Sequence, residues 1–242
     1  MKVSDYTNKE FLEKYKKAPI SHPYIVFPKI LELVGRIEGK KILDLGGGSG
    51  DLSRLLANKG AIVDCVDVSK EWVEICKKDN LDVKNLNCYQ SNASDLKLIK
   101  DSTFDIVIMN MVLLNIDSKQ KLEKTFKEVS RILKKEGSFI FTDLHPLCLM
   151  IPKSLTEQQS YLNDFSYFKD GSRFKSKVIL SDSSTSIEFI DMHWTLETYT
   201  KLINDNGMYI FRIVEAQPIK NSPKIFNDYK MPEHILFYCK KN

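Results

Sequence analysis

The sequence lacks an apolar stretch that could cross a lipid bilayer. Its longest apolar run, residues 106–114, is interrupted by Asn110 and is too short to span the hydrocarbon core. The first residues, Met1 to Tyr6, are polar and do not have the apolar centre of a secretory signal peptide. We therefore expect a cytoplasmic protein that has no membrane partner.

Closely spaced cysteines are also missing. The five cysteines lie far apart, and none belongs to a Cys-x-x-Cys pair; they are Cys65, Cys76, Cys88, Cys148 and Cys239. Metal sites and disulfide frameworks are typically marked by regularly spaced cysteines. The sequence therefore predicts no metal site, and it predicts buried, reduced thiols in place of disulfides.

Neither charge nor composition indicates a special class of partner. The net charge of +4, the 43% of hydrophobic residues and the 28% of charged residues are ordinary for a globular protein. No internal repeat or low-complexity tract is visible. A length of 242 residues fits one domain that carries a sizeable insertion. The oligomeric state is not indicated by any of these features.

Apolar strand patterns alternate with amphipathic helix patterns along much of the chain. Helices are predicted over 51–58, from Ser69 onward, over 118–133 and over 195–206. Strands are predicted over 41–45, 61–67, 83–89, 104–109, 138–144, 208–215 and 234–239. This alternation predicts an α/β fold, a Rossmann-like, doubly wound and mostly parallel sheet of seven strands with helices on both faces.

The alternation also suggests four segments. Residues 1–35 are expected to form an N-terminal helical cap, and residues 36–144 the core that binds a cofactor. Residues 145–193 follow strand five, show few helix signals and contain many aromatic residues, so we expect a substrate-side insertion or lid built on a hairpin. Residues 194–242 would supply a helix and the last two strands of the core.

The most informative stretch is a glycine loop after the first strand. Asp44 ends an apolar run, and Gly46, Gly47, Gly48 and Gly50 follow before a helical pattern begins. Glycine lets a ligand lie against bare backbone amides, and a helix N-terminus favours negative charge. The dinucleotide fingerprint of hydride-transfer enzymes requires a third glycine where this chain has Asp51. The loop therefore predicts a nucleotide-type ligand of another kind.

An acidic residue ends the second strand. Asp67 lies about 20 residues after the loop, where such folds place a residue that accepts hydrogen bonds from ribose hydroxyls. A carboxylate accepts two hydroxyl hydrogen bonds and repels a 2′-phosphate. The ligand is therefore expected to carry a free ribose.

These motifs, in this order, resemble those of the class I S-adenosylmethionine-dependent methyltransferases of the small-molecule type. The resemblance covers roughly residues 40–144 and includes the segments Phe104–Val107 and Leu133–Gly137, with a looser likeness in 193–218. It implies that the cofactor is S-adenosyl-L-methionine. The residues that it implies as cofactor ligands are Asp44, Gly46, Gly47, Gly48, Gly50, Asp67, Val68, Asn92, Ala93 and Asn110. Asn92 departs from the aspartate that is usual in the family, although its amide oxygen can still accept a hydrogen bond from adenine.

The resemblance also implies in-line transfer of a methyl group, in which positioning is the main catalytic effect. A general base is needed only where the nucleophile must lose a proton. His145, directly after strand five, is the leading candidate for that base. His193, expected at the start of a helix that faces the insertion, is the second. Each could instead be a histidine bonded to the backbone.

Three functions remain open, and a small-molecule acceptor ranks first. Methylation of tRNA or another nucleic acid ranks second, since Asn110-Met111-Val112-Leu113 lacks the prolines of amino-methylating enzymes that act on bases. Pro146-Leu147-Cys148 does not supply the Pro-Cys nucleophile of C5-cytosine enzymes, and no concentrated basic and aromatic face is visible. A non-catalytic protein that binds S-adenosylmethionine ranks third.

Overall fold

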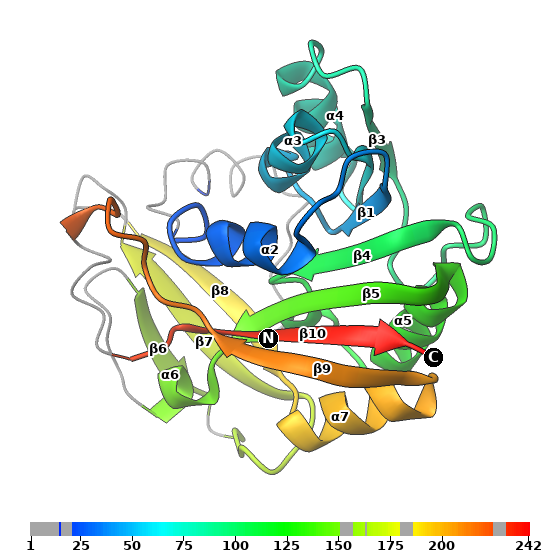
Figure 1. The fold of residues 1–242 in the computed structure, drawn as a ribbon. Coiled ribbons are helices and arrows are strands. Elements are labelled where there is room, and N and C mark those ends of the chain that lie inside the picture. Colours follow the sequence, from blue (N-terminus) through cyan, green and yellow to red (C-terminus); the bar gives the residue numbers. More distant parts are fainter. Residues whose placement is uncertain (1–14, 16–20, 151–156, 163, 180–185, 225–230) are drawn as a thin grey trace.

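A seven-stranded sheet forms the centre of the chain (Figure 1). The computed structural model describes residue 15 and residues 21–150, 157–162, 164–179, 186–224 and 231–242. Across the sheet the strands are β3 (Leu86–Gln90), β2 (Ile62–Asp67), β1 (Lys41–Leu45), β4 (Phe104–Asn110), β5 (Leu133–Leu144), β10 (His234–Lys241) and β9 (Met208–Glu215). The first five are parallel, and β10 runs antiparallel to both of its neighbours. The predicted fold class is confirmed.

Three of the five longer helices begin at a capping side chain. The five helices are α2 (Val26–Val34), α3 (Asp51–Asn58), α4 (Lys70–Asp79), α5 (Lys119–Ile132) and α7 (Leu196–Asp205). The hydroxyls of Ser69, Ser118 and Thr195 accept hydrogen bonds from backbone amides in the first turns of α4, α5 and α7. Such caps satisfy amides that have no partner within the helix, so the predicted starting points hold to within a residue. Most of the predicted N-terminal helical cap before α2, residues 1–14 and 16–20, lies outside the described residues.

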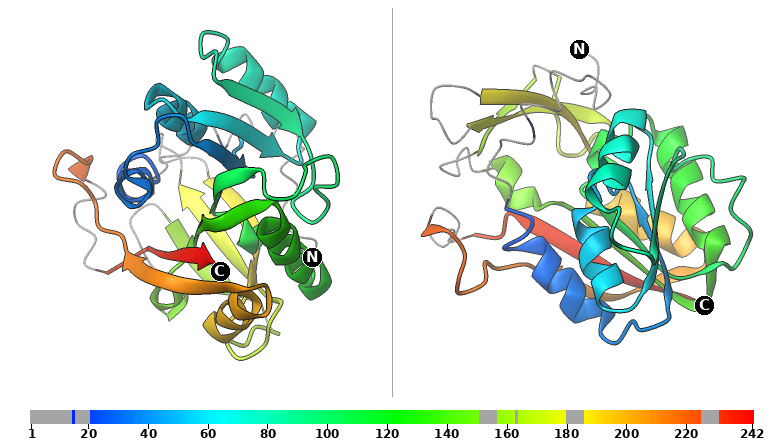
Figure 2. Two further views of the ribbon diagram at one scale, coloured as in Figure 1. Left: turned by 45° about the vertical axis from the view of Figure 1, so that its right-hand side comes forward. Right: turned by 90° about the horizontal axis from the view of Figure 1, so that it is seen from above.

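Helices cover both faces of the sheet (Figure 2). Successive side chains of a strand point to opposite faces, and β1 shows this clearly. Ile42 packs in the cluster that includes α2 and α3, whereas Leu43 packs in the cluster that includes α5 and α7. On the α5 side, Phe126 contacts the rings of Phe139 and Phe141. The sheet is therefore buried on both sides, as parallel sheets usually are.

A second, smaller sheet stands beyond the carboxyl end of β5 (Figure 1). After the short helix α6 (Pro146–Met150), the strands β6 (Glu157–Tyr161), β7 (Ser172–Ile179) and β8 (Ser186–His193) pair in order and antiparallel. The insertion is thus a three-stranded sheet where a hairpin was expected. Trp194, directly after β8, donates its indole N–H to the carbonyl of Leu113 at 3.0 Å. This bond ties the small sheet to the short 3-10 helix η1 (Leu113–Asn115) that follows β4.

Two local expectations are wrong. His193 is the last residue of β8 and pairs with Ser172, so it does not begin a helix. The strand expected over 138–144 starts earlier than expected, because β5 begins at Leu133, directly at the end of α5, and includes residues 135–137. The pairing of β4 with β5 shifts register near this point, and Glu136 has a φ of 62°. The backbone of β5 is therefore irregular at residues 135–137.

The cysteine prediction is wrong for one pair. Cys76 of α4 and Cys88 of β3 form a disulfide, although 12 residues separate them in the sequence. Helix α4 lies against β3 and brings the two Cα atoms to 6.2 Å, a proximity that sequence spacing alone does not reveal. Cys65 and Cys239 are buried thiols, as expected.

Within the part of the chain that the structure describes, no helix combines the length and the apolar character needed to span a bilayer.

The aromatic cluster beneath α5 yields a stability prediction. Phe126 is fully buried against Phe139, Phe141 and Tyr199. Phe126→Ala should lower the free energy of unfolding by about 3–5 kcal/mol, because it removes buried ring contacts and leaves a cavity. The exposed neighbour Lys127→Ala should change it by less than about 0.5 kcal/mol. Urea unfolding followed by circular dichroism measures both values, and equal effects would contradict the packing described.

Candidate functional site

The candidate site begins at the glycine loop between β1 and α3. The backbone amides of Gly46 and Gly47 both donate to the carbonyl of Val66, at 2.6 and 3.1 Å. A Cβ on Gly47 would lie 2.5 Å from the sulfur of Cys65 and 2.9 Å from a carboxylate oxygen of Asp44. The loop is therefore bare backbone because the end of β2 and the side chain of Asp44 leave no room behind it.

Asp44 supports the loop from below. It is 1% exposed, and its Oδ2 accepts a hydrogen bond of 2.6 Å from the Ser53 hydroxyl of α3. Burial raises the pKa of Asp44 to about 6, and the nearby carboxylates of Asp67 and Asp51 add to the effect. The side chain thus links β1 to α3 and also lines the cavity described below.

Asp67 faces the loop from the end of β2. Its Oδ2 accepts from the Gly48 amide at 3.0 Å, and its Oδ1 accepts from the Ser69 amide at 2.9 Å. Burial raises its pKa, while these backbone hydrogen bonds oppose the shift. Each carboxylate oxygen can accept a further hydrogen bond, so Asp67 can bind two neighbouring hydroxyls of a ligand.

A cavity of about 470 Å³ extends from this loop to the small sheet. Its near end is lined by nine of the ten residues expected to bind a cofactor: Asp44, Gly46, Gly47, Gly48, Asp67, Val68, Asn92, Ala93 and Asn110. Gly50 does not line it. That residue is the N-cap of α3 with a φ of 83°, and a Cβ there would meet the sulfur of Cys76. The structure therefore brings the dispersed motif residues to one place.

Two asparagines in the cavity wall have their amide oxygens engaged within the chain. Asn92 Oδ1 accepts from both the amide and the hydroxyl of Ser94, each at 2.9 Å. Asn110 Oδ1 accepts from the Thr142 hydroxyl at 2.8 Å, and that hydroxyl in turn accepts from the Met111 amide. These bonds fix the strand end of β4 and the loop after β3, so the cavity wall is preorganised there.

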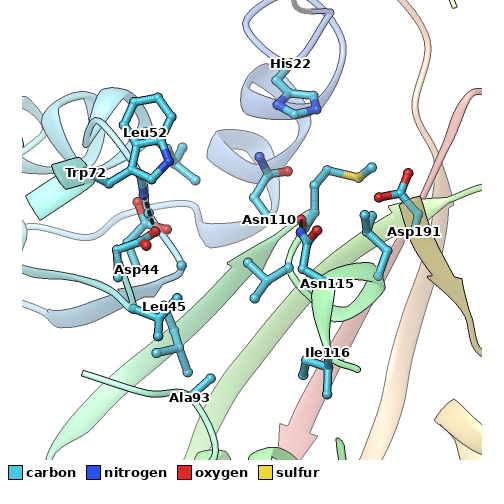
Figure 3. Close-up of a pocket in the computed structure, with 18 of the residues that line it drawn as sticks. His22, Asp44, Leu45, Leu52, Trp72, Ala93, Asn110, Asn115, Ile116 and Asp191 are labelled. Carbon is cyan, nitrogen blue, oxygen red and sulfur yellow. Dashed lines mark hydrogen bonds between the residues drawn. The ribbon is translucent and has the colours of Figure 1, made fainter. Parts of the chain in front are cut away.

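The far end of the cavity has a mixed apolar and polar lining. Apolar side chains there include Leu144 and Phe189, and the polar ones come from separate elements: Asn115, Ser176, Asp191 and His234. Figure 3 shows Asp44 and Trp72 on one side of the cavity and Asp191 on the other, with Asn110 and Asn115 between them. The cavity therefore joins a nucleotide-type end to a second, chemically different end.

Residues before α2 also contribute to the wall. The ring of Tyr15 lies edge-to-face against both Trp72 and Phe189, at centroid distances of 6.0 and 5.9 Å. His22 lines the cavity, and its ring centre lies 5.4 Å from that of His234. Burial and the neighbouring His234 lower the pKa of His22 to about 3, so this ring is neutral near pH 7. Of these residues, Tyr15 contacts both ends of the cavity, Trp72 at the near end and Phe189 at the far end.

Both histidines predicted as a general base lie outside the lining of this cavity. His145 contacts Glu215 through Nε2 at 3.0 Å, and its Nδ1 accepts from the Leu147 amide. His193 Nε2 donates to the carbonyl of Tyr167 at 2.8 Å, and burial lowers the pKa of His193. Both rings are engaged with neighbouring parts of the chain, which is the alternative that the sequence left open. Their catalytic role stays a prediction.

Sequence reasoning missed the polar residues at the far end. Asp191 lies on β8 in the segment Ile187-Glu188-Phe189-Ile190-Asp191, where it shares a strand face with Ile187 and Phe189. An acidic residue on the otherwise apolar face of a strand is the sequence feature that could have indicated this site. His234 and Asn115 follow no such pattern, because their placement depends on contacts between distant segments.

The chain matches a family model described as a methyltransferase domain over residues 43–141. Among curated relatives, the ubiquinone/menaquinone biosynthesis C-methyltransferase UbiE of Vibrio parahaemolyticus is 28% identical over 187 residues, which are 73% of this chain and 67% of the relative. The enzyme of the same name from Haemophilus ducreyi is 34% identical over 117 residues, 46% of this chain and 43% of the relative. The chain thus spans about half to two thirds of these relatives.

Solved structures show the same fold. An S-adenosylmethionine dependent methyltransferase from Mesorhizobium loti superposes with a TM-score of 0.67 at 18% identity, covering 88% of this chain and 96% of that one. A SAM dependent methyltransferase from Aquifex aeolicus has a TM-score of 0.61 at 16% identity and covers 97% and 100% of the two chains. At these identities the likeness concerns the fold alone.

The raised pKa of Asp44 predicts a pH-dependent stability. Between about pH 4 and pH 6 the folded chain binds a proton at Asp44 that the unfolded chain has released, so this residue lowers stability as the pH rises. Asp44→Asn, which keeps an oxygen that can accept from Ser53, should gain stability relative to the wild type as the pH rises from 4 to 7, on the order of 2 kcal/mol. Urea unfolding at several pH values measures this difference. The exposed Asp79→Asn is the control, and a gap between wild type and Asp44→Asn that is constant with pH would contradict the assignment.

Proposed function

We propose that the chain is a class I S-adenosylmethionine-dependent methyltransferase and that it transfers a methyl group to a small molecule bound at the far end of its cavity. The observation that carries this proposal is the single cavity that joins the glycine loop and Asp67 to a wall built by the small sheet. Its volume of about 470 Å³ lies in the range of small-molecule sites, about 300–1,000 Å³. The relatives are named for ubiquinone/menaquinone biosynthesis, and this name agrees with a small-molecule acceptor.

The residues at the near end fit S-adenosylmethionine. Asp67 would accept hydrogen bonds from the ribose hydroxyls, and the loop 46–50 would face the methionine part through its backbone. A Cβ placed on Gly48 would meet only Trp72, at 3.9 Å, so the backbone on that side of the loop is accessible. Val68, Ala93 and Trp72 provide a largely apolar surround for the adenine. The wall therefore offers each part of the cofactor a partner of suitable chemistry.

The charges of the lining favour a small molecule over a nucleic acid. Six carboxylates and one lysine are found among the described residues of the wall: Asp44, Asp51, Asp67, Asp117, Asp191, Glu233 and Lys121. Nucleic-acid binding draws much of its affinity from lysine and arginine that neutralise phosphates. A wall of this composition repels a phosphate backbone.

The chain's contribution to the reaction is mainly positioning. S-adenosylmethionine supplies a methyl group on a positively charged sulfur, which becomes neutral when the methyl group leaves. Asp67 and the loop hold one reactant, and the far wall holds the other, so that the two meet in line. Such positioning contributes up to about 7–11 kcal/mol in favourable cases. Tyr15, between Trp72 and Phe189, helps to exclude water from the cavity.

Removal of Asp67 tests the cofactor end. Asp67→Ala should weaken the binding of S-adenosylhomocysteine, the demethylated product, at least tenfold, because hydrogen bonds to a charged group contribute about 1.5–3 kcal/mol. Isothermal titration calorimetry measures the affinity. Asp64→Ala is a matched control, since Asp64 lies on the same strand but bonds to Asn87 and Tyr89 outside the cavity. Unchanged affinity in Asp67→Ala would refute the ribose assignment.

The acceptor class is tested by incubating the protein with methyl-labelled S-adenosylmethionine and either a small-molecule extract or total tRNA. We expect label only in the small-molecule fraction, because the lining is acidic. Label confined to tRNA would overturn the proposed acceptor class. Binding of S-adenosylhomocysteine without transfer to any pool would indicate a non-catalytic binder.

A further inference from the structure

Three residues that line the far end of the cavity each carry a buried polar atom without a hydrogen-bond partner among the described residues. These atoms are Asn115 Oδ1, Asp191 Oδ1 and His234 Nδ1. They come from η1, β8 and β10, three elements that are distant in the sequence. Buried polar groups in native proteins are nearly always bonded, and an unbonded one is costly. Their convergence on one wall points to a ligand that completes their hydrogen bonds.

Asp191 is the most sharply defined of the three. Its side chain is almost fully buried, with 3% of the residue exposed. Oδ2 accepts a hydrogen bond of 2.9 Å from Ser176 of β7, which fixes the carboxyl group and leaves Oδ1 without a partner among the described residues. Figure 3 shows Asp191 on the side of the cavity opposite Asp44 and Trp72, with its side chain turned toward the interior. No ion pair with Asp191 is formed by the described residues.

The other two atoms are hydrogen-bond acceptors. The Asn115 amide nitrogen donates to the carbonyl of Met111 at 3.1 Å, which assigns its oxygen to the cavity. His234 Nε2 lies 3.2 Å from a carboxylate oxygen of Glu233 and 3.1 Å from the Ser21 hydroxyl. In the neutral tautomer that carries its proton on Nε2, beside these two oxygens, the ring presents Nδ1 as an acceptor. The ligand must therefore supply donors.

We propose that Asp191 is the general base of the proposed methyl transfer, and that the acceptor is a compact, partly apolar molecule whose nucleophile is an O–H or N–H group. This inference rests on the proposed function. The acceptor's oxygen or nitrogen forms the new bond to the methyl carbon while the carbon–sulfur bond breaks. The electron pair of the broken bond stays on the sulfur. The proton of the nucleophile passes to Asp191 Oδ1. Asn115 Oδ1 and His234 Nδ1 accept from further donors of the acceptor and orient it.

The electrostatic surroundings agree with this role. Burial, with a contribution from Asp143 of β5, raises the pKa of Asp191 to about 7, close to the value that suits a base working near neutral pH. The other titratable groups on this part of the wall are His22, Glu233 and His234. Any pH dependence is therefore compared between the wild type and a variant that lacks the Asp191 carboxylate.

The first experiment uses the wild-type protein loaded with S-adenosylhomocysteine, and calorimetry with paired probes. Catechol and 1,2-dimethoxybenzene form one pair, and aniline and N,N-dimethylaniline, which are both largely neutral over the pH range used, form the other. We expect at least one protic probe to bind tenfold or more tightly than its partner, with an affinity that rises from pH 5.5 to pH 8 as Asp191 ionises. Preference for catechol would indicate a hydroxyl nucleophile, and preference for aniline an amine. Equal affinity within both pairs would overturn the proposal.

The second experiment uses Asp191→Asn, which keeps the shape of the side chain but cannot take up the proton. Label transfer from S-adenosylmethionine into the small-molecule extract should slow by about 10²- to 10⁴-fold, and the pH dependence near 7 should disappear. Affinity for S-adenosylhomocysteine should stay within threefold. Glu188→Gln is the matched control, because Glu188 lies on the same strand, outside the cavity lining, in an exposed pair with Lys175.

The outcomes separate this inference from the proposed function. Transfer by Asp191→Asn at the wild-type rate would overturn the role of Asp191 and leave the proposed function intact. Loss of S-adenosylhomocysteine binding by the wild type would instead refute the proposed function. Should Asp191→Asn fail to fold, as judged by circular dichroism, the probe pairs on the wild type decide the question.

Discussion

The site depends on the hydrogen bonds between the end of β2 and the glycine loop. The carbonyl of Val66 accepts from two loop amides, and the carboxylate of Asp67 accepts from a third, Gly48. A Cβ on Gly47 would collide with Cys65 and Asp44, and a Cβ on Gly46 with Val112, so these two positions stay without a side chain. A backbone wall, a carboxylate and a helix N-terminus then meet at one edge of the sheet, where ligands bind in such folds.

Three buried carboxylates connect this edge to the rest of the core. Asp44, Asp143 and Asp191 each accept from one hydroxyl, those of Ser53, Tyr199 and Ser176. Burial raises the pKa of each of them. Asp44 and Asp191 line the cavity, and Asp143 does not. Asp191 also has a buried oxygen, Oδ1, without a hydrogen-bond partner among the described residues. We therefore place Asp191 at the acceptor end, apart from Asp44, which supports the glycine loop.

The cofactor end could be predicted from the sequence because its signals are local. A strand, its terminal acid and the following glycines are neighbours in the chain, and caps such as Ser69 and Thr195 mark helix starts directly. The far end could not, since Asn115, Asp191 and His234 meet only through tertiary contacts. His145 follows β5 as expected, but its ring bonds to Glu215 of β9, a pairing set by the order of strands in the sheet. The Cys76–Cys88 disulfide was missed for the same reason.

A crystal structure of the protein with S-adenosylhomocysteine tests the central claim most directly, namely that one cavity holds the cofactor at the β2 end and leaves the Asp191 end to the acceptor. The account predicts ribose hydroxyls within hydrogen-bond distance of the Asp67 carboxylate, and the sulfur turned toward the space in front of Asp191. A ligand bound without contact to Asp67, or one whose adenosine fills the space beside Asp191, would contradict it.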